Sequence, residues 1–343
     1  GGTEMVDVIV SYREMPSVAE RARTKSLGAK TKREFKHLAM RAMRIPAKRL
    51  EALSSHPRVR FVTVDAPVEG FLASAKATAL VPELGTAGYV SAESDVRVAV
   101  LDSGVGSHSD LAVKSRVNII PAATYCTDWD YDECQSWGTH YDPFGHGTHV
   151  AGTISGNPNW LSSAGSNATL SGVAAGAQII SVRVLDEDGR GYASDVLAGL
   201  DWVMDHHVSY DIRVVNMSLG KAVEEAAADD PLVQAVESLW DAGVVVVCSA
   251  GNYGTYGHYT ITSPGNSQKV ITVGSLTNNG TGSDFTDDYT STYSSMGPTL
   301  FDHVLKPDLL APGNRVIAAI SNEALLKDLL PVSYTHLRAH ETL

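Results

Sequence analysis

Apolar and polar positions along the first part of the chain predict a small folded unit. Residues 6–12 and 59–65 are rich in β-branched residues, which predicts a strand in each segment. Between these strands, a basic stretch over 17–43 is compatible with a helix, and a second helix is expected over 46–55. Residues 1–66 therefore predict a small α+β domain.

The remaining chain carries a different, repeating pattern. Residues 67–95 are rich in Ala, Gly and Ser without a clear period, and we expect them to form a linker into the second domain. From residue 96 onward, β-branched runs alternate with helical segments. This predicts an α/β fold, a doubly wound parallel sheet with helices on both faces. The expected strands cover 96–102, 178–186, 212–220, 243–251 and 269–275, and the expected helices cover 194–206 and 231–242.

Polar residues follow three of these strands at the point where each strand ends. Asp102 ends the first strand, Ser218 and Gly220 end the third, and Asn252 follows the fourth. Because the carboxyl ends of parallel strands meet at the same edge of a sheet, these residues predict one functional site.

Length and composition agree with a globular protein of two domains. The chain has 343 residues, of which 43% are hydrophobic and 19% are charged. No apolar run approaches the ~20 residues that a membrane helix needs, so we expect no membrane partner. No basic segment followed by an apolar stretch stands at the start, so the sequence shows no signal peptide.

Charge is divided unevenly between the two parts of the chain. Residues 1–66 hold 14 Lys and Arg against 7 Asp and Glu, whereas the rest holds 13 against 32, for a net charge of −12 overall. A basic segment on an acidic body is typical of a nucleic-acid arm or of a domain docked by complementary charge. The apolar patterning of residues 1–66 favours the docked domain, and we expect no nucleic-acid partner.

His146 heads a run of small residues, GHGTHVAGT, at positions 145–153. A histidine at a helix start among glycines is a candidate proton carrier. Together with His149 it could ligate a metal, but a third ligand and the glutamate of the H-E-x-x-H pattern are missing. Asp102 has alternatives of its own, a loop cap or the ribose contact of a nucleotide fold. The nucleotide interpretation fails because no G-x-G-x-x-G follows the first strand.

Two further segments are suited to binding a peptide. Ser218, Leu219 and Gly220 follow a strand and offer a backbone edge to which an extended peptide could add. Asn252 stands between glycines in SAGNYG, where its amide could point into a cleft, although asparagine in such surroundings is also a common turn residue.

Taken in order, the motifs VLDSG, GHGTHVAGT, NMSLG and SAGN resemble the subtilisin-like serine proteases, the subtilases. The resemblance runs from about residue 96 to 320. It implies that Asp102 orients His146 as general base and that Asn252 donates to the oxyanion. It also implies a primary specificity pocket lined by Ser218, Leu219, Gly220 and Pro264.

Residues 6–66 resemble the propeptide of the same family, which acts as an intramolecular chaperone and inhibitor. The resemblance therefore implies a subtilisin-like fold preceded by a propeptide domain, a polypeptide substrate, and the chain's own propeptide docked on the peptidase domain. It also implies a monomeric, extracellular protein whose chemistry requires no cofactor.

An insert between Asp102 and His146 carries two of the three cysteines. Cys126 and Cys134 are candidates for a local disulfide, which would indicate an oxidising compartment, with free thiols or a weak metal loop as the alternatives. Cys248 is expected to be a small buried hydrophobe. Asp110 stands where the family places a calcium ligand, so we carry a structural calcium ion as an expectation.

The family's nucleophile lies in a Gly-Thr-Ser-Met-Ala motif, and no Gly-Thr-Ser occurs in this sequence. Ser321 and Ser333 do not stand in a glycine-flanked turn that leads into a helix, so we reject both as nucleophiles. We expect an incomplete peptidase domain over 96–330 and a non-native tail over 331–343. The sequence thus predicts a serine endopeptidase precursor truncated before its serine, and therefore inactive. The alternative is a non-catalytic, protease-like binding module.

Overall fold

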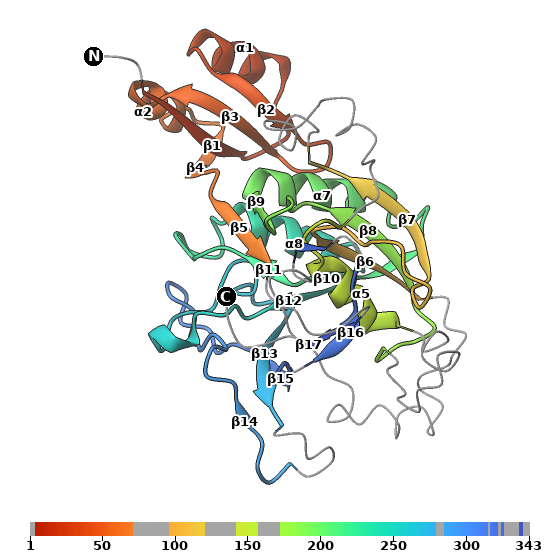
Figure 1. Ribbon diagram of the computed structural model, residues 1–343. Coiled ribbons are helices and arrows are strands. Elements are labelled where there is room, and N and C mark those ends of the chain that lie inside the picture. Colours follow the sequence, from red (N-terminus) through yellow and green to blue (C-terminus); the bar gives the residue numbers. More distant parts are fainter. Residues whose placement is uncertain are drawn as a thin grey trace.

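The computed structural model describes most of the chain and separates it into an N-terminal unit and a main body (Figure 1). The N-terminal unit comprises residues 4–66, and the main body begins at residue 96. The described residues are 4–70, 96–120, 142–156, 172–278, 285–314, 316–321, 324–325 and 336–338.

The N-terminal unit is a four-stranded antiparallel sheet with the strand order β2-β3-β1-β4. Its first strand is buried on both faces, because Val8 and Val10 belong to the core of the unit whereas Ile9 packs against the main body. The elements are β1 (Met5–Tyr12), α1 (Val18–Ser26), β2 (Lys30–Glu34), β3 (Met40–Pro46), the 3-10 helix η1 (Ala47–Arg49), α2 (Leu50–Ser54) and β4 (Val59–Val64).

The helix expected over 17–43 is wrong. Helix α1 begins after Ser17, whose side chain and that of Glu20 form a capping box, and it ends at Ser26. Gly28 then takes a φ of +83°, a left-handed conformation that ends a helix readily only at glycine. Beyond it, pairing with β3 turns the basic residues 30–34 into an edge strand, a tertiary interaction that overrides their helix propensity.

The main body is built on a sheet with the strand order β14-β13-β12-β10-β6-β8-β7, and β15 also pairs with β13. All of these pairs are parallel except the one between β14 and β13. The strands are β6 (Arg97–Asp102), β7 (Val113–Asn118), β8 (Gln178–Arg183), β10 (Ile212–Met217), β12 (Val245–Ser249), β13 (Ile271–Thr277), β14 (Tyr289–Thr290) and β15 (Leu309–Pro312).

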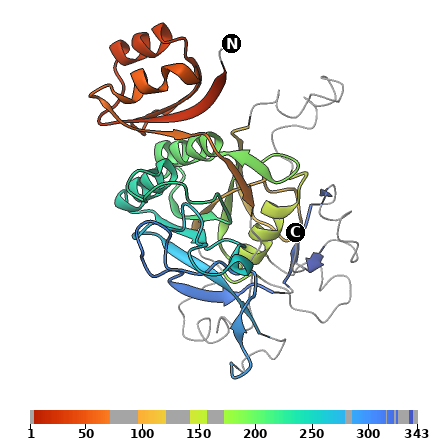
Figure 2. The same ribbon diagram turned by 90° about the vertical axis from the view of Figure 1, so that its left-hand side faces the viewer.

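Helices cover both faces of this sheet, which confirms the doubly wound α/β fold (Figure 2). Helices α7 (Ala193–His206) and α8 (Pro231–Asp241) share one core cluster with the central strands. Helix α5 (His146–Ser155) packs on the other face, where Val150 and Ala151 meet Val98 and Val100 of β6. The short 3-10 helix η3 (Gly254–Tyr256) and the pair of β16 (Ile317–Ala319) and β17 (His336–Arg338) complete the described elements.

A second, three-stranded sheet joins the two parts of the molecule. Its order is β11-β5-β9, formed by β11 (Leu219–Gly220), β5 (Pro67–Gly70) and β9 (Arg190–Tyr192), and both pairs are antiparallel. Strand β5 lies within the expected linker 67–95, of which residues 71–95 fall outside the described part of the chain. It follows β4 closely, so the N-terminal unit leads directly into this sheet.

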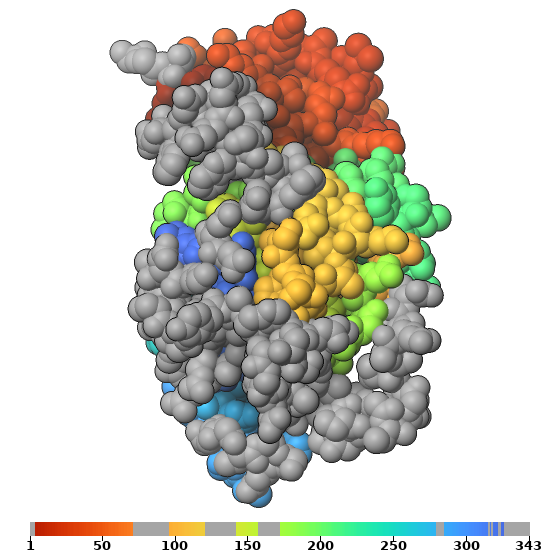
Figure 3. All heavy atoms as spheres, turned by 45° about the vertical axis from the view of Figure 1, so that its right-hand side comes forward, coloured from red at the N-terminus to blue at the C-terminus, as the bar shows by residue number. Residues whose placement is uncertain are grey.

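The N-terminal unit lies over helix α7 (Figures 1 and 2). Figure 3 shows the unit in red and orange, seated against yellow and green segments of the main body. Phe35, Leu38 and Met40 are buried and belong to the same core cluster as α7. Apolar burial of this extent makes the unit part of the folded molecule rather than an appended arm.

Basic residues of the N-terminal unit meet an acidic side of α7. The backbone N–H groups of Lys36 and His37 donate to the Asp201 carboxylate at 2.7 and 2.6 Å. The Lys36 Nζ atom lies 2.5 Å from Asp205 Oδ1, and the His37 ring lies 3.1 Å from the same oxygen. Arg33 forms a further ion pair with Asp195. Complementary charge thus adds to apolar burial at this interface.

Of the three cysteines, the structure describes Cys248 alone. Cys126 and Cys134 lie outside the described residues. Cys248 is a free thiol with 1% of its surface exposed, as expected for a small buried hydrophobe, and burial raises its pKa to about 12. Among the described helices, none has the length and hydropathy to cross a bilayer.

Candidate active site

Asp102 and His146, 44 residues apart in the chain, meet at the carboxyl end of the central sheet. Asp102 is the last residue of β6, and His146 is the first residue of α5. The His146 Nδ1 atom lies 2.6 Å from Asp102 Oδ1, and both side chains are fully buried or nearly so. With the carboxylate as acceptor, Nδ1 carries the proton, which fixes the tautomer of the imidazole.

A second buried carboxylate, Asp142, organises the loop that carries His146. Asp142 Oδ1 accepts hydrogen bonds from the Ser103 hydroxyl and the Gly145 N–H, each at 2.7 Å. Its Oδ2 accepts from the N–H and the hydroxyl of Thr148, also at 2.7 Å. Burial raises the pKa of Asp142, while these four hydrogen bonds oppose that rise. Asp142 therefore ties the first turn of α5 to the residue that follows Asp102.

Small residues around His146 permit this close arrangement. Gly145 precedes the helix with a φ of +99°, a left-handed conformation that a side chain disfavours. Gly147 packs so tightly that a Cβ built on it would collide with the carbonyl oxygen of Gly104 and lie 3.0 Å from the Asp102 Cβ. Gly147 is thus required for β6 and α5 to approach each other, whereas Gly145 is required by the turn that precedes α5.

Ser218, Leu219 and Gly220 lie beside this pair as the continuation of β10. Leu219 and Gly220 form β11 and are buried, and the Ser218 hydroxyl accepts a hydrogen bond from the Asn216 side chain at 3.0 Å. The next residue, Lys221, forms an antiparallel bridge with Ser263, the residue before Pro264. The structure therefore brings Pro264 next to the end of β11.

Asn252 follows the end of β12, three residues after Ser249. The residue after it, Tyr253, donates a hydrogen bond from its hydroxyl to Oε1 of Glu69 in β5. The loop that carries Asn252 thus reaches the same three-stranded sheet as Leu219 and Gly220.

Strand β5 pairs with the backbone edge that the sequence analysis marked as a candidate for binding an extended peptide. Gly70 pairs with Leu219 and Glu69 pairs with Gly220, while the opposite edge of β5 pairs with β9. A Cβ built on Gly70 would lie 3.3 Å from the His146 ring. Val68 is buried in the main core cluster. A segment of the chain itself thus fills the backbone edge that the sequence marked for a peptide.

A buried ionic cluster stands directly behind β11. Lys221 Nζ lies 3.1 Å from Glu225 Oε1 and 3.4 Å from Asp230 Oδ2. The N-terminal unit reaches this cluster through Thr63, whose hydroxyl donates to Glu225 Oε2 at 3.0 Å. Burial raises the pKa of Glu225, and the neighbouring carboxylates raise the pKa of Lys221 against the effect of its own burial.

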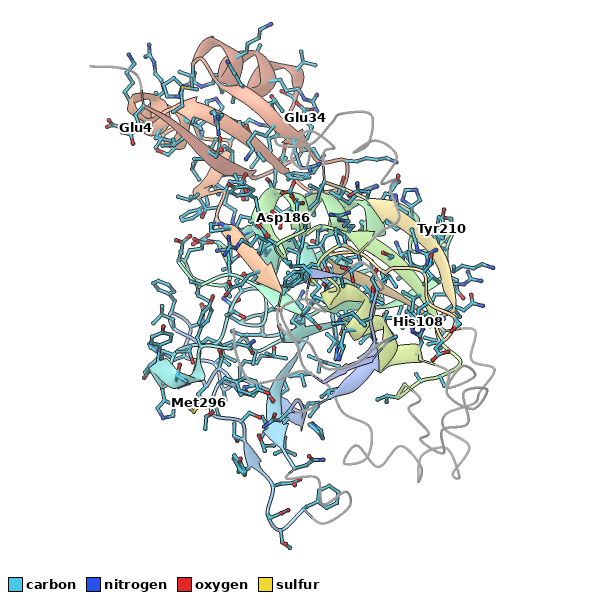
Figure 4. All side chains as sticks on the ribbon, viewed as in Figure 1. Glu4, Glu34, His108, Asp186, Tyr210 and Met296 are labelled. Atoms are coloured by element: carbon cyan, nitrogen blue, oxygen red, sulfur yellow. The ribbon has the colours of Figure 1, made fainter. Side chains whose placement is uncertain are left out.

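Asp110, the expected calcium ligand, lies in a short polar loop before β7. Asp110 is buried, Ser109 donates to its Oδ1 atom at 3.2 Å, and its N–H donates to His108 at 3.1 Å. Figure 4 labels His108 near the end of β7, and burial lowers the pKa of this histidine. No cluster of three or more His, Cys, Asp or Glu residues that could hold a metal occurs among the described residues.

Neither serine that the sequence analysis rejected gains support as a nucleophile. Ser321 is buried and lies where a Cβ on Gly106 would come within 2.9 Å of its Oγ, next to Thr148. Ser333 lies outside the described residues.

Sequence reasoning missed three residues of this site. Asp142 lies four residues before His146, the first residue of α5, too far for the usual N-cap position, yet its carboxylate accepts the Thr148 N–H as a capping side chain would. Gly70 and Glu69 belong to the stretch interpreted as linker. Only the alternation of Pro67–Gly70 could have suggested a strand there, and four residues are too few for a reliable period.

A doubly wound sheet with a buried Asp–His pair at its carboxyl edge, beside a bound peptide strand, defines an α/β protein with the acid–base machinery of a hydrolase. A family model described as "Subtilase family" matches residues 93–340. The chain therefore belongs to the subtilase family, the subtilisin-like serine proteases.

Individual relatives agree with this assignment. Serine protease AprX of Bacillus subtilis (strain 168) is 36% identical over 282 residues, covering 81% of this chain and 59% of the relative. Subtilisin E of the same strain is 30% identical over 314 residues, or 89% of this chain and 71% of the relative. An extracellular serine proteinase of Thermus sp. (strain Rt41A) is 33% identical over 287 residues, or 81% of this chain and 58% of the relative.

Proposed function

We propose that this chain is a serine endopeptidase precursor in which residues 1–66 form the inhibitory propeptide domain and β5 is the segment that leads from it to the cleavage site. Strand β5 carries this proposal, because it lies in the peptide-binding edge with Gly70 against His146 and continues directly from the N-terminal unit. The acidic side of α7 and its basic partners support a docked domain rather than a nucleic-acid arm. The substrate is then a polypeptide that binds in the extended conformation.

The chemistry follows from the Asp–His pair. Asp102 holds the Nδ1–H of His146, so Nε2 is the nitrogen that takes the proton of a serine hydroxyl as it attacks the peptide carbonyl. Asp102 also stabilises the imidazolium that forms. The Asn252 amide is the proposed donor to the oxyanion, and removal of such a donor in subtilisin itself costs about 10²–10³ in rate. Ser218, Leu219, Gly220 and Pro264 are the proposed walls of the specificity pocket.

The 343-residue chain itself is proposed to be inactive. It contains no Gly-Thr-Ser, the motif that carries the nucleophilic serine in the subtilases. Without that hydroxyl, catalysis over water falls to the ~10³–10⁴-fold that binding and oxyanion stabilisation provide. A monomeric, extracellular protein is part of the proposal, supported by the extracellular relative from Thermus. A structural calcium ion with Asp110 as a ligand is also part of the proposal.

Labelling with a fluorophosphonate tests the assignment. The 343-residue chain is expected to remain unlabelled and to leave a peptide ester intact, and stoichiometric labelling would refute its inactivity. The same chain, extended at its C-terminus by a subtilase segment that carries Gly-Thr-Ser-Met-Ala, is expected to be labelled. A His146→Ala version of the extended chain is the control and is expected to lose the label.

The non-catalytic binding module remains the second candidate function. A binding module would retain a folded peptide-binding edge. Under this alternative, the extended chain stays unlabelled even when circular dichroism shows that the chain is folded. Reading the encoding DNA beyond codon 330 separates the two directly, since a downstream Gly-Thr-Ser-Met-Ala supports the protease.

The position of β5 also supports a specific processing site. Because Gly70 pairs with Leu219 and lies against His146, cleavage is proposed within one or two residues on the carboxyl side of Gly70. Mass spectrometry of the extended chain is expected to show release of a fragment that ends there. Release at a bond more than a few residues away would contradict this assignment.

A further inference from the structure

One side chain of the bound strand β5 points away from the core and is met by an aromatic hydroxyl. Along β5, Val68 is buried and Gly70 lies against His146, whereas Glu69 between them is exposed. The hydroxyl of Tyr253 donates a hydrogen bond to Glu69 Oε1 across 184 positions of sequence. This contact therefore joins the strand in the peptide-binding edge to the loop that carries Asn252.

Tyr253 is held in place by its own neighbours. Its backbone N–H donates to the Ser295 hydroxyl at 3.0 Å, and the next N–H, that of Gly254, donates to the Tyr293 carbonyl at 2.9 Å. The ring lies 6.4 Å from that of Tyr256. A donor fixed in this way before a peptide binds contributes to selectivity, because little conformational freedom is lost when the peptide arrives.

We propose that Tyr253 is a specificity-determining residue that selects substrates with a hydrogen-bond acceptor side chain, above all a carboxylate, at the position that Glu69 occupies in β5. This inference rests on the proposed function, since it takes β5 as the occupant of the substrate site. The selected position immediately precedes the residue that packs against His146. An acceptor side chain at this position gains the hydrogen bond from the Tyr253 hydroxyl, whereas an apolar side chain does not.

The chemistry of the phenol supports a donor role. Partial burial raises the pKa of Tyr253, and the hydrogen bond to Glu69 raises it further. The hydroxyl therefore keeps its proton throughout the neutral and mildly alkaline range, and a carboxylate, which is acceptor-only, is its natural partner.

Arg190 offers a competing explanation for an acidic preference. It stands opposite Glu69 in the register of β5 and β9, so a cation faces the same strand position. The two explanations separate at Glu69→Gln, which removes the charge but keeps a carbonyl oxygen as acceptor. Selection by Tyr253 tolerates glutamine, whereas selection by the charge of Arg190 does not.

Hydrogen exchange of the full 343-residue chain tests the proposal, with the backbone amides of Ala66 and of residues 68–70 as the readout, since Pro67 has no N–H. Glu69→Leu and Tyr253→Phe are each expected to speed exchange of this segment about five- to tenfold, the effect of losing one hydrogen bond. The double variant is expected to exchange no faster than either single variant. Glu69→Gln and the control Tyr256→Phe, on the exposed neighbouring ring, are expected to stay within about twofold of the parent.

Each contrary result has a defined meaning. Selection by Tyr253 would be overturned by any of three results: additive effects of the two substitutions, an unaffected Tyr253→Phe variant, or loss of protection in Glu69→Gln. Each of these results would leave the docking of β5 intact. Unprotected amides of Ala66 and residues 68–70 in the parent chain would instead overturn the docking itself, and the proposed function with it. Uniformly faster exchange across β6 and β10 would mark a variant as unfolded, and Tyr253→Phe, which removes a single oxygen, is chosen to avoid that.

Discussion

Asp65, in the N-terminal unit, receives two hydrogen bonds from Ser194 in the first turn of α7. The Ser194 N–H donates to Asp65 Oδ1 at 2.9 Å and its hydroxyl donates to Oδ2 at 2.8 Å. Lys32 Nζ lies 2.6 Å from the same Oδ2, and the Asp65 side chain is fully buried. A carboxylate at a helix N-terminus is also stabilised by the helix dipole. One residue of the N-terminal unit thus completes the start of a helix in the main body.

Removing this carboxylate is expected to loosen the N-terminal unit. Asp65→Ala leaves the N–H and hydroxyl of Ser194 and the Lys32 ammonium without their acceptor, with an expected loss of about 2–4 kcal/mol in docking free energy. Limited trypsin digestion measures the effect as faster cleavage within residues 4–66. Glu51→Ala, at an exposed acidic position of the same unit, is the control, and equal cleavage rates for the two variants would contradict the prediction.

Asp142 is expected to control the geometry of the Asp–His pair without touching it. Asp142→Ala leaves four donors without an acceptor, so we expect a loss of about 3 kcal/mol or more in unfolding free energy and displacement of His146. The readout is the downfield proton NMR signal of the His146 Nδ1–H, which should weaken or shift. Asp142→Asn keeps one acceptor oxygen and should retain more of the signal. An unchanged signal in Asp142→Ala would show that His146 is positioned without this residue.

Acidification is expected to weaken the interface between the N-terminal unit and α7. Hydrogen bonds from Lys36 and His37 lower the pKa of Asp205 below its ordinary value of 3.8. A lowered folded pKa contributes stability that is complete above the unfolded value and is lost as the pH falls through the folded value. The midpoint of urea unfolding in Asp205→Asn should therefore lie below the parent's at neutral pH and converge with it as the pH falls below 3.8 and through the lowered folded pKa. A difference that persists unchanged at the lowest pH would argue against an ionisation effect.

The glycine after His146 is expected to be among the least replaceable residues of the chain. Gly147→Ala would drive a Cβ into the Gly104 carbonyl, and because both sides of the contact are backbone, we expect a loss of at least about 3 kcal/mol in unfolding free energy. Thermal unfolding measures it. Gly28→Ala is the matched control, because its Cβ meets only Pro46 at 3.5 Å and its cost is limited to the ~1–2 kcal/mol of a left-handed residue. Similar losses for both variants would contradict the steric argument.

Features that depend on local pattern could be predicted from the sequence, whereas those that depend on long-range pairing could not. The β-branched runs predicted five strands of the central sheet, β6, β8, β10, β12 and β13, but not β7, β14 and β15. The strand-end rule placed Asp102 and the segment 218–220 at one edge. The basic residues 30–34 do not form the expected helix, since their pairing with β3 makes them a strand. Strand β5 escaped prediction for the same reason, because its partners β9 and β11 lie more than a hundred residues away.

Strand β5 is separated from β4 by only Asp65 and Ala66, and this short connection has a kinetic and thermodynamic consequence. A free peptide that binds between β11 and β9 must displace β5, which is tethered beside these strands. Short tethers give effective concentrations on the order of millimolar, so a free peptide of micromolar affinity gains access only when the N-terminal unit is released or digested. Binding of a free peptide at this edge is thus governed by how long the N-terminal unit stays docked, rather than by the affinity of the free peptide for the edge.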